Sequence, residues 1–127
     1  MNDEQYLAHC QEQLNDFAQG LVKRTEHLPV NDTLRELAQA FQSLAAGDAS
    51  LYEEGPTLVT RLFTTYTDLA PSFPRELLWF FGGDCLHYMP DTEIAVFQQL
   101  ADLRSDAAAK GEVLDIRAAR AGLLNLQ

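Results

Sequence analysis

Apolar residues recur along most of the chain at alternating spacings of three and four, the pattern typical of amphipathic helices. Residues 3–27 show this pattern at Leu7, Cys10, Leu14, Phe17 and Leu21. Residues 31–47 repeat it at Leu34, Leu37, Phe41 and Leu44. Pro29 would end the first helix, Asn31 or Asp32 would cap the second, and Gly47 suits its exit. The pattern therefore predicts two helices in the first third of the chain.

A third helix is predicted to begin at Pro56, after a connector at residues 48–55 in which one helical turn is an open alternative. Five threonines in this stretch lower helix propensity and admit a strand: Thr57, Thr60, Thr64, Thr65 and Thr67. The apolar spacing of three and four favours a helix, because a half-buried strand would alternate.

The remaining helices are bounded by proline and glycine. After the break at "APSFP", a fourth helix is predicted from about Pro74 to Met89. A fifth is predicted over 92–110, capped by Asp91 and stopped by Gly111, and a short last helix should follow Asp115.

These elements predict an all-α fold, a single compact bundle of five or six helices in which residues 1–127 form one domain. The helix at 74–89 should lie at the centre, because its apolar residues cover almost its whole circumference. A chain of 127 residues is long enough for one core. We expect that core to contain Leu14, Phe17, Phe41, Leu62, Leu78, Phe81 and Phe97.

Charge excludes several classes of partner. The chain has 19 acidic and 9 basic residues, a net charge of −10, and its basic residues are scattered. Such a chain is not expected to bind nucleic acid or an anionic membrane, whereas a basic protein partner remains allowed. No apolar run is long enough to span a bilayer, the N-terminus lacks a secretory pattern, and Cys10 and Cys85 suit buried thiols in a reducing compartment. We therefore expect a cytoplasmic protein.

The stretch "ELLWFFGGDCLHYMPDTEI", residues 76–94, holds the candidate chemistry. Asp84 and His87 are three residues apart, so on a helix their side chains can meet. Two ligands are too few for zinc, which favours a simple hydrogen bond over a metal site, and no metal or cofactor is predicted. Cys85 would be a reactive thiol only if a new helix began after Gly82 and Gly83. Otherwise it is a buried thiol.

The glycine pair has two interpretations. Two successive glycines inside a helix cost about 1 kcal/mol each relative to alanine, so they need a compensating reason. One is a notch into which another helix packs, and the other is a break in the helix at Gly82 and Gly83. The notch is favoured, because Asp84 in the first turn of a new helix would oppose a bound anion.

The aromatic residues beside the glycines suggest core packing or an interaction surface. Candidate interface or pocket residues are Trp79, Phe80, Gly82, Gly83 and Tyr88. The sequence predicts a small helical protein that acts by binding another protein, with a homodimer as an open alternative. A second hypothesis is a metal- or thiol-dependent small enzyme or sensor built on Asp84, Cys85 and His87.

Overall fold

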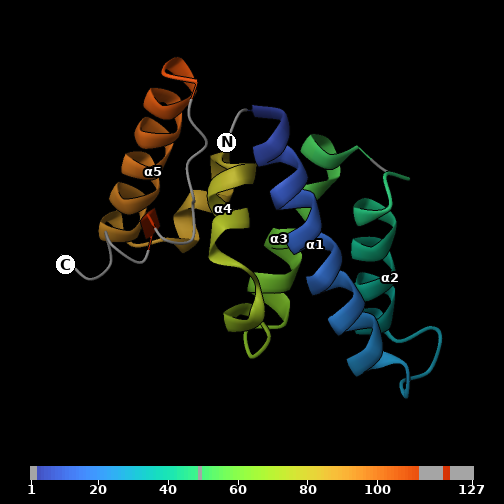
Figure 1. The fold of residues 1–127 in the computed structure, drawn as a ribbon. Coiled ribbons are helices and arrows are strands. Elements are labelled where there is room, and N and C mark those ends of the chain that lie inside the picture. Colours follow the sequence, from blue (N-terminus) through green and yellow to red (C-terminus); the bar gives the residue numbers. More distant parts are fainter. Residues whose placement is uncertain (1–2, 49, 112–118, 121–127) are drawn as a thin grey trace.

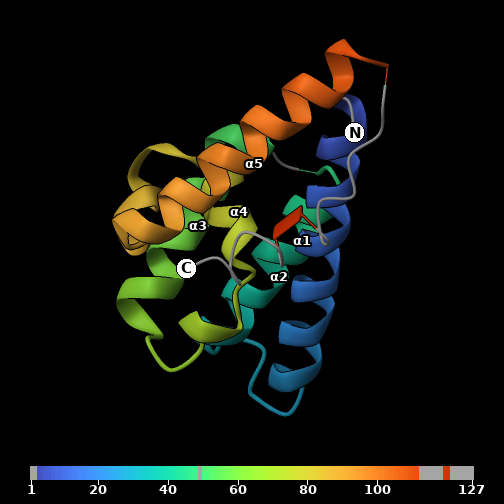
Figure 2. The same cartoon turned by 60° about the vertical axis from the view of Figure 1, so that its left-hand side comes forward.

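Two antiparallel helices pack side by side at the start of the chain (Figures 1 and 2). They are α1 (Asp3–Thr25) and α2 (Thr33–Ala45) in a computed structural model that describes residues 3–48, 50–111 and 119–120. Asp32 caps α2, because its Oδ1 accepts a hydrogen bond from the Leu34 backbone N–H at 2.9 Å. Both predicted helices are confirmed, and the capping oxygen comes from Asp32.

The third helix, α3 (Leu51–Thr65), begins five residues earlier than predicted. Most of the expected connector is its first turn, so Pro56 lies inside the helix. The proline has no N–H to donate to the carbonyl four residues earlier, yet the helix continues through it. The threonine-rich stretch is helical as far as Thr65, as the apolar spacing predicted, and Thr67 lies in the turn after the helix.

The continuous helix predicted over 74–89 is wrong. α4 (Arg75–Phe81) ends at Gly82, and a 3-10 helix, η2 (Gly83–Tyr88), follows. Gly82 has φ 63° and ψ −153°, and Gly83 has φ 52°. These backbone conformations exclude most residues with a side chain, which explains the glycine pair. The break, and not the favoured notch, is the correct interpretation.

The close approach of helices occurs at a different glycine. Gly55 in α3 is buried, and a Cβ atom there would overlap the ring of Phe81 at the end of α4. At Gly83 a Cβ atom would meet nothing within 4 Å, and at Gly82 only the Trp79 carbonyl at 3.8 Å. The notch therefore lies on α3 and receives an aromatic ring.

The last described helix, α5 (Asp91–Ala109), lies beside α4 on the side away from α2 (Figure 1). Pro90, and not Asp91, is its N-cap residue, so the predicted cap is wrong by one position. A short 3-10 turn, η1 (Ala70–Ser72), occupies the predicted break before α4. The short helix predicted after Asp115 lies almost entirely outside the described residues.

An arginine ties the start of α4 to the start of α5. Arg75 Nε donates a hydrogen bond to Glu93 Oε1 at 2.8 Å, and its Nη2 donates to the Tyr88 carbonyl at 2.9 Å. One side chain thus holds the beginning of α4, the end of η2 and the first turn of α5 together. We call this contact the Arg75 clamp.

The core lies among α1, α2, α3 and α4 and extends to α5, which contributes Val96, Phe97 and Leu100. The predicted shared core is confirmed: five of its seven members are buried, and Phe17 and Phe81 are partly buried against it. Phe73, which the break before α4 contributes, also lies in the core, with its ring 4.9 Å from that of Phe17. Every regular element among the described residues is helical, and none of these helices combines the length and apolar character needed to cross a membrane.

Candidate functional site

A buried polar pair joins α1 to α4. Tyr6, His9 and Cys10 lie on one face of α1, because they are spaced at i, i+3 and i+4. His9 Nε2 lies 2.6 Å from Glu76 Oε1, and the Glu76 side chain is 3% exposed. A carboxylate removed from water needs such a partner, because its burial without one costs several kcal/mol. The pair is a polar contact inside an apolar interface.

Two further ionisable side chains surround this pair, and both stay protonated at neutral pH. Burial raises the pKa of the Tyr6 phenol far above its usual range, and the neighbouring Cys10 and Glu76 add to the effect. Burial also raises the pKa of the Cys10 thiol, with a contribution from Glu76, to about 12. A thiol reacts as the thiolate, so Cys10 is unsuited to nucleophilic catalysis here.

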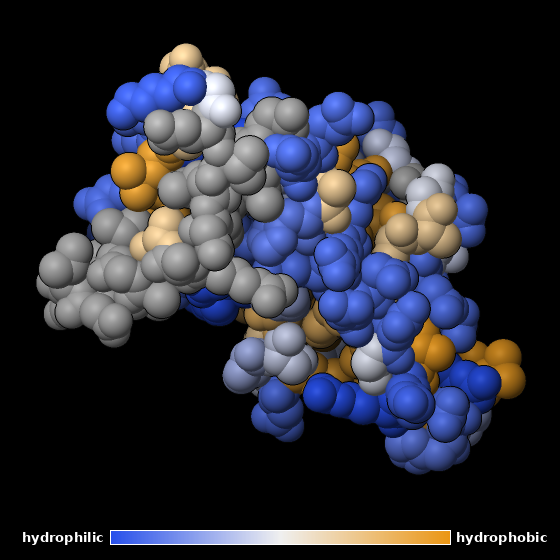
Figure 3. Space-filling view, in the orientation of Figure 1, coloured by the Kyte–Doolittle hydropathy of each residue, from blue (hydrophilic) through white to orange (hydrophobic). Residues whose placement is uncertain are grey.

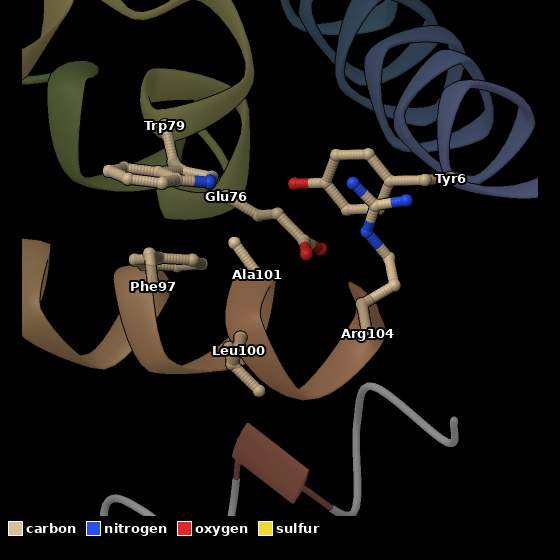
Figure 4. Close-up of a pocket in the computed structure, with 7 residues that line it drawn as sticks. All are labelled: Tyr6, Glu76, Trp79, Phe97, Leu100, Ala101 and Arg104. Carbon is tan, nitrogen blue, oxygen red and sulfur yellow. The ribbon is translucent and has the colours of Figure 1, made fainter. Parts of the chain in front are cut away.

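A small cavity lies between α1, α4 and α5 (Figure 4). Its volume is about 20 Å³, which is close to the space that one water molecule occupies. Figure 4 shows the Glu76 carboxylate pointing toward Tyr6 and Arg104, while Trp79 lies over Phe97. The last two rings are stacked, with centroids 6.2 Å apart. The cavity can hold a solvent molecule, but it is too small for an organic substrate.

Arg104 closes one side of this cavity. Its guanidinium carbon lies 4.7 Å from the centroid of the Tyr6 ring, and its Nη1 lies 2.7 Å from Asp3 Oδ1. The cation therefore contacts an aromatic face and a carboxylate together, the geometry of a cation–π contact reinforced by an ion pair.

A larger groove opens beside Tyr6, where the first turns of α1 and α3 meet the end of α4. Its volume is about 450 Å³, and we call it the aromatic groove; it is lined by Asp3, Glu4, Tyr6, Leu7, Tyr52 and Phe80. The Phe80 ring lies between two tyrosines, with its centroid 6.3 Å from that of Tyr6 and 5.7 Å from that of Tyr52. Of these three rings that of Tyr52 is the most exposed, because the residue is 64% exposed whereas Tyr6 and Phe80 are partly buried.

Comparison with known protein families gives one match. The model of the PA2817-like family matches residues 3–127, almost the whole chain. The chain belongs to the PA2817-like family. No curated protein and no solved structure matches the chain. The family description states no activity, so function has to be argued from the site itself.

The structure does not unite Asp84, Cys85 and His87. Asp84 Oδ1 lies 3.8 Å from His87 Nε2, and these two side chains are 90% and 81% exposed. Cys85 is completely buried, and burial together with Asp84 raises the pKa of its thiol to about 11. The thiol thus lies in the core and the other two side chains in solvent. In the part of the chain that the structure describes, no three His, Cys, Asp or Glu side chains are grouped to hold a metal.

The five residues predicted as an interface or pocket are separated in space. Trp79 lines the small cavity and Phe80 lines the aromatic groove. Tyr88 packs on Phe63, with ring centroids 4.5 Å apart. Gly82 and Gly83 form the break after α4. Of the five, only Phe80 reaches the groove, and the role of the set as an interface stays a prediction.

The sequence reasoning missed Glu76, Tyr6 and Arg104. The available signal was a glutamate just before the apolar run "LLWFF", at a position that a buried helix turns inward. His9 lies in α1, far from Glu76 in the sequence. Its actual partner is 67 residues away, a distance over which helical spacing gives no information.

Proposed function

We propose that this protein acts by binding a segment of another protein in the aromatic groove. The observation that carries the proposal is the exposure of Tyr52, which is 64% exposed although its ring lies beside Phe80. Tyrosine and phenylalanine are enriched at protein interfaces, where large rings bury much area at low entropic cost. A surface tyrosine over a second aromatic ring is therefore a suitable anchor for a partner.

The dimensions of the groove suit a short segment. Its volume is about 450 Å³ and it is open to solvent, so it can seat side chains of a bound segment without enclosing them. On the face drawn in Figure 3, most of the described surface is hydrophilic and its apolar areas are small and separate. The described part of that face therefore offers local anchor points and lacks the broad apolar area that an obligate dimer buries.

Charge favours a different protein over a second copy of this chain. Asp3 and Glu4 stand at the rim of the aromatic groove, and the whole chain carries a net charge of −10. A second copy would bring the same negative charge to the contact, and juxtaposed like charges oppose association. We therefore favour a neutral or basic partner, and the homodimer predicted as an alternative becomes one outcome of the test.

The metal- or thiol-dependent enzyme or sensor has less support. Both described thiols are buried and their pKa values are raised, which suppresses the thiolate form. The cavity beside Glu76 has only the volume of a water molecule. Free buried thiols suit a reducing compartment, so we propose the cytoplasm as the place of the interaction.

A site-specific photo-cross-linker tests the proposal. Tyr52 is replaced by a benzophenone amino acid, and the protein is irradiated in its native host. The matched control carries the same group at Thr60, which is exposed on the same helix but does not line the groove. We expect one protein to be cross-linked from position 52 and not from position 60.

The captured protein is then purified and its affinity measured. The Phe80→Ser variant, with its helical content checked by circular dichroism, should bind it at least about tenfold more weakly, as for loss of an aromatic anchor. Equal affinity for wild type and variant would contradict binding in the groove. Cross-links to a second copy of this chain, or equal cross-linking from both positions, would overturn the proposal.

A further inference from the structure

We infer that the segment bound in the aromatic groove presents an arginine, whose guanidinium stacks on the Tyr52 and Phe80 rings and pairs with Glu4. This inference rests on the proposed function and names the chemistry of the partner.

Arg104 is an internal example of this recognition. Its guanidinium carbon lies 4.7 Å from the Tyr6 ring centroid while its Nη1 contacts the Asp3 carboxylate at 2.7 Å. The first turns of α1 thus already provide an aromatic face and a carboxylate to one guanidinium. Planar guanidinium groups suit both partners, because they stack on rings and donate hydrogen bonds in their plane.

The described residues that line the aromatic groove repeat these elements, with rings and a carboxylate, and include no arginine or lysine. Tyr52 and Phe80 provide two rings whose centroids are 5.7 Å apart. Glu4 is exposed, lines the same groove, and makes no hydrogen bond or ion pair with any described residue. Asp3 is already engaged by Arg104, so among the described residues that line the groove Glu4 is the carboxylate without such a contact.

Leu7 in the groove and the net charge of the chain indicate which residues should flank the arginine in the bound segment. Leu7 adds an apolar surface, so a neighbouring apolar side chain of the segment can be buried beside the arginine. The net charge of −10 attracts a cationic segment and repels an acidic one. Lysine meets the charge requirement but cannot stack as a plane, so arginine should be preferred.

Three short peptides test this inference. They share the sequence acetyl-Leu-X-Leu-Gly-amide, in which X is arginine, lysine or citrulline, the last being a neutral analogue of arginine with nearly the same shape. Each is titrated into the isotopically labelled full chain and followed by NMR. We expect the arginine peptide to shift the signals of Glu4, Leu7, Tyr52 and Phe80, the lysine peptide to bind more weakly, and citrulline to bind weakest.

Variants locate the binding site. Glu4→Gln and Tyr52→Leu should each weaken the arginine peptide by about threefold to tenfold, the range of an exposed ion pair or cation–π contact. The control Glu53→Gln removes one negative charge from the neighbouring exposed position and should change affinity much less. The difference between arginine and citrulline should shrink at high salt, because exposed charges are screened.

The peptide titrations and the cross-linking experiment test different claims, so failure of the inference can be distinguished from failure of the proposed function. Equal binding of the arginine and citrulline peptides, or absence of binding by all three at millimolar concentration, would overturn the inference. Arginine binding that Glu53→Gln weakens as much as Glu4→Gln would also overturn it, because the attraction would then reflect overall charge. A partner cross-linked from position 52 would still support protein binding in each of these cases.

Discussion

His9 Nε2 lies 2.6 Å from Glu76 Oε1, and this contact joins the first turns of α1 to the first turn of α4. The Glu76 side chain is 3% exposed and that of His9 is 15% exposed. Because a single apolar face could pack in several ways, a buried polar contact of this kind restricts how the two helices can meet.

Removing one partner of this pair should be costly. The His9→Leu variant leaves the Glu76 carboxylate buried without its hydrogen bond, and we expect a loss of about 2–3 kcal/mol in the free energy of unfolding. The His9→Leu/Glu76→Leu double variant should lose less than the sum of the two single variants, because it removes the unpaired charge. Urea unfolding curves measure all three. The Asp3→Asn variant is the control. Because the Asp3 side chain is exposed, this variant should leave the midpoint of urea unfolding nearly unchanged.

The buried thiols predict a loss of stability in alkali. The pKa values of Cys10 and Cys85 rise from 9.0 to about 12 and about 11 on folding. Between pH 9 and these values the unfolded chain releases the protons and the folded chain retains them, so stability falls as pH rises. Unfolding curves at neutral pH and at pH about 10.5 should show this decrease. In Cys85→Ala it should be smaller, and an equal decrease would contradict the assignment to that thiol.

Alanine at Gly55 and at Gly20 should have opposite effects. Both glycines are helical, but a Cβ atom at Gly55 would overlap the Phe81 ring, whereas one at Gly20 would meet nothing within 4 Å. Gly55→Ala should cost about 1–3 kcal/mol through overpacking. Gly20→Ala should stabilise by about 0.4–1 kcal/mol, because it restricts the unfolded chain. Thermal and urea unfolding of the pair measures this, and a shift of the same sign in both would refute it.

The glycines after α4 should tolerate no side chain, for a different reason. Gly82 and Gly83 have positive φ angles, so Gly83→Ala should destabilise by about 1–2 kcal/mol although there is space for its methyl group. Gly82→Ala should cost at least as much, because its conformation is accessible almost only to glycine. Hydrogen exchange should show weaker protection at the end of α4 in both variants. Unchanged stability in both would mean that the break is not required.

Helix positions could be predicted from the sequence because they depend on local periodicity. The apolar spacing located α1, α2 and α5 to within a few residues, and it identified the threonine-rich α3 as helical. The apolar spacing failed over residues 74–89. There nine apolar residues cover the whole circumference of the predicted helix, so no polar face marks the point where the helix ends. There the backbone conformation of Gly82 decides the structure, and apolar periodicity does not report φ.

The candidate site could be predicted only in part. Aromatic residues near Phe80 suggested an interface, but two of the rings that contact it, Tyr6 and Tyr52, come from two other helices. Asp84 and His87 were noticed because they are close in sequence, and they meet only in solvent. Contacts such as that of Asp3 with Arg104, separated by 101 residues, depend on how helices pack, which local spacing does not encode.

The Arg75 clamp has a consequence for the order of folding. It closes a loop of only 18 residues, whereas the contacts of α1 with α4 and α5 span 67 and 101 residues. Short loops lose less chain entropy on closure, so α4, η2 and the start of α5 can associate before α1 docks on them. Mutation of Arg75 should therefore slow refolding, while mutation of His9 should mainly accelerate unfolding.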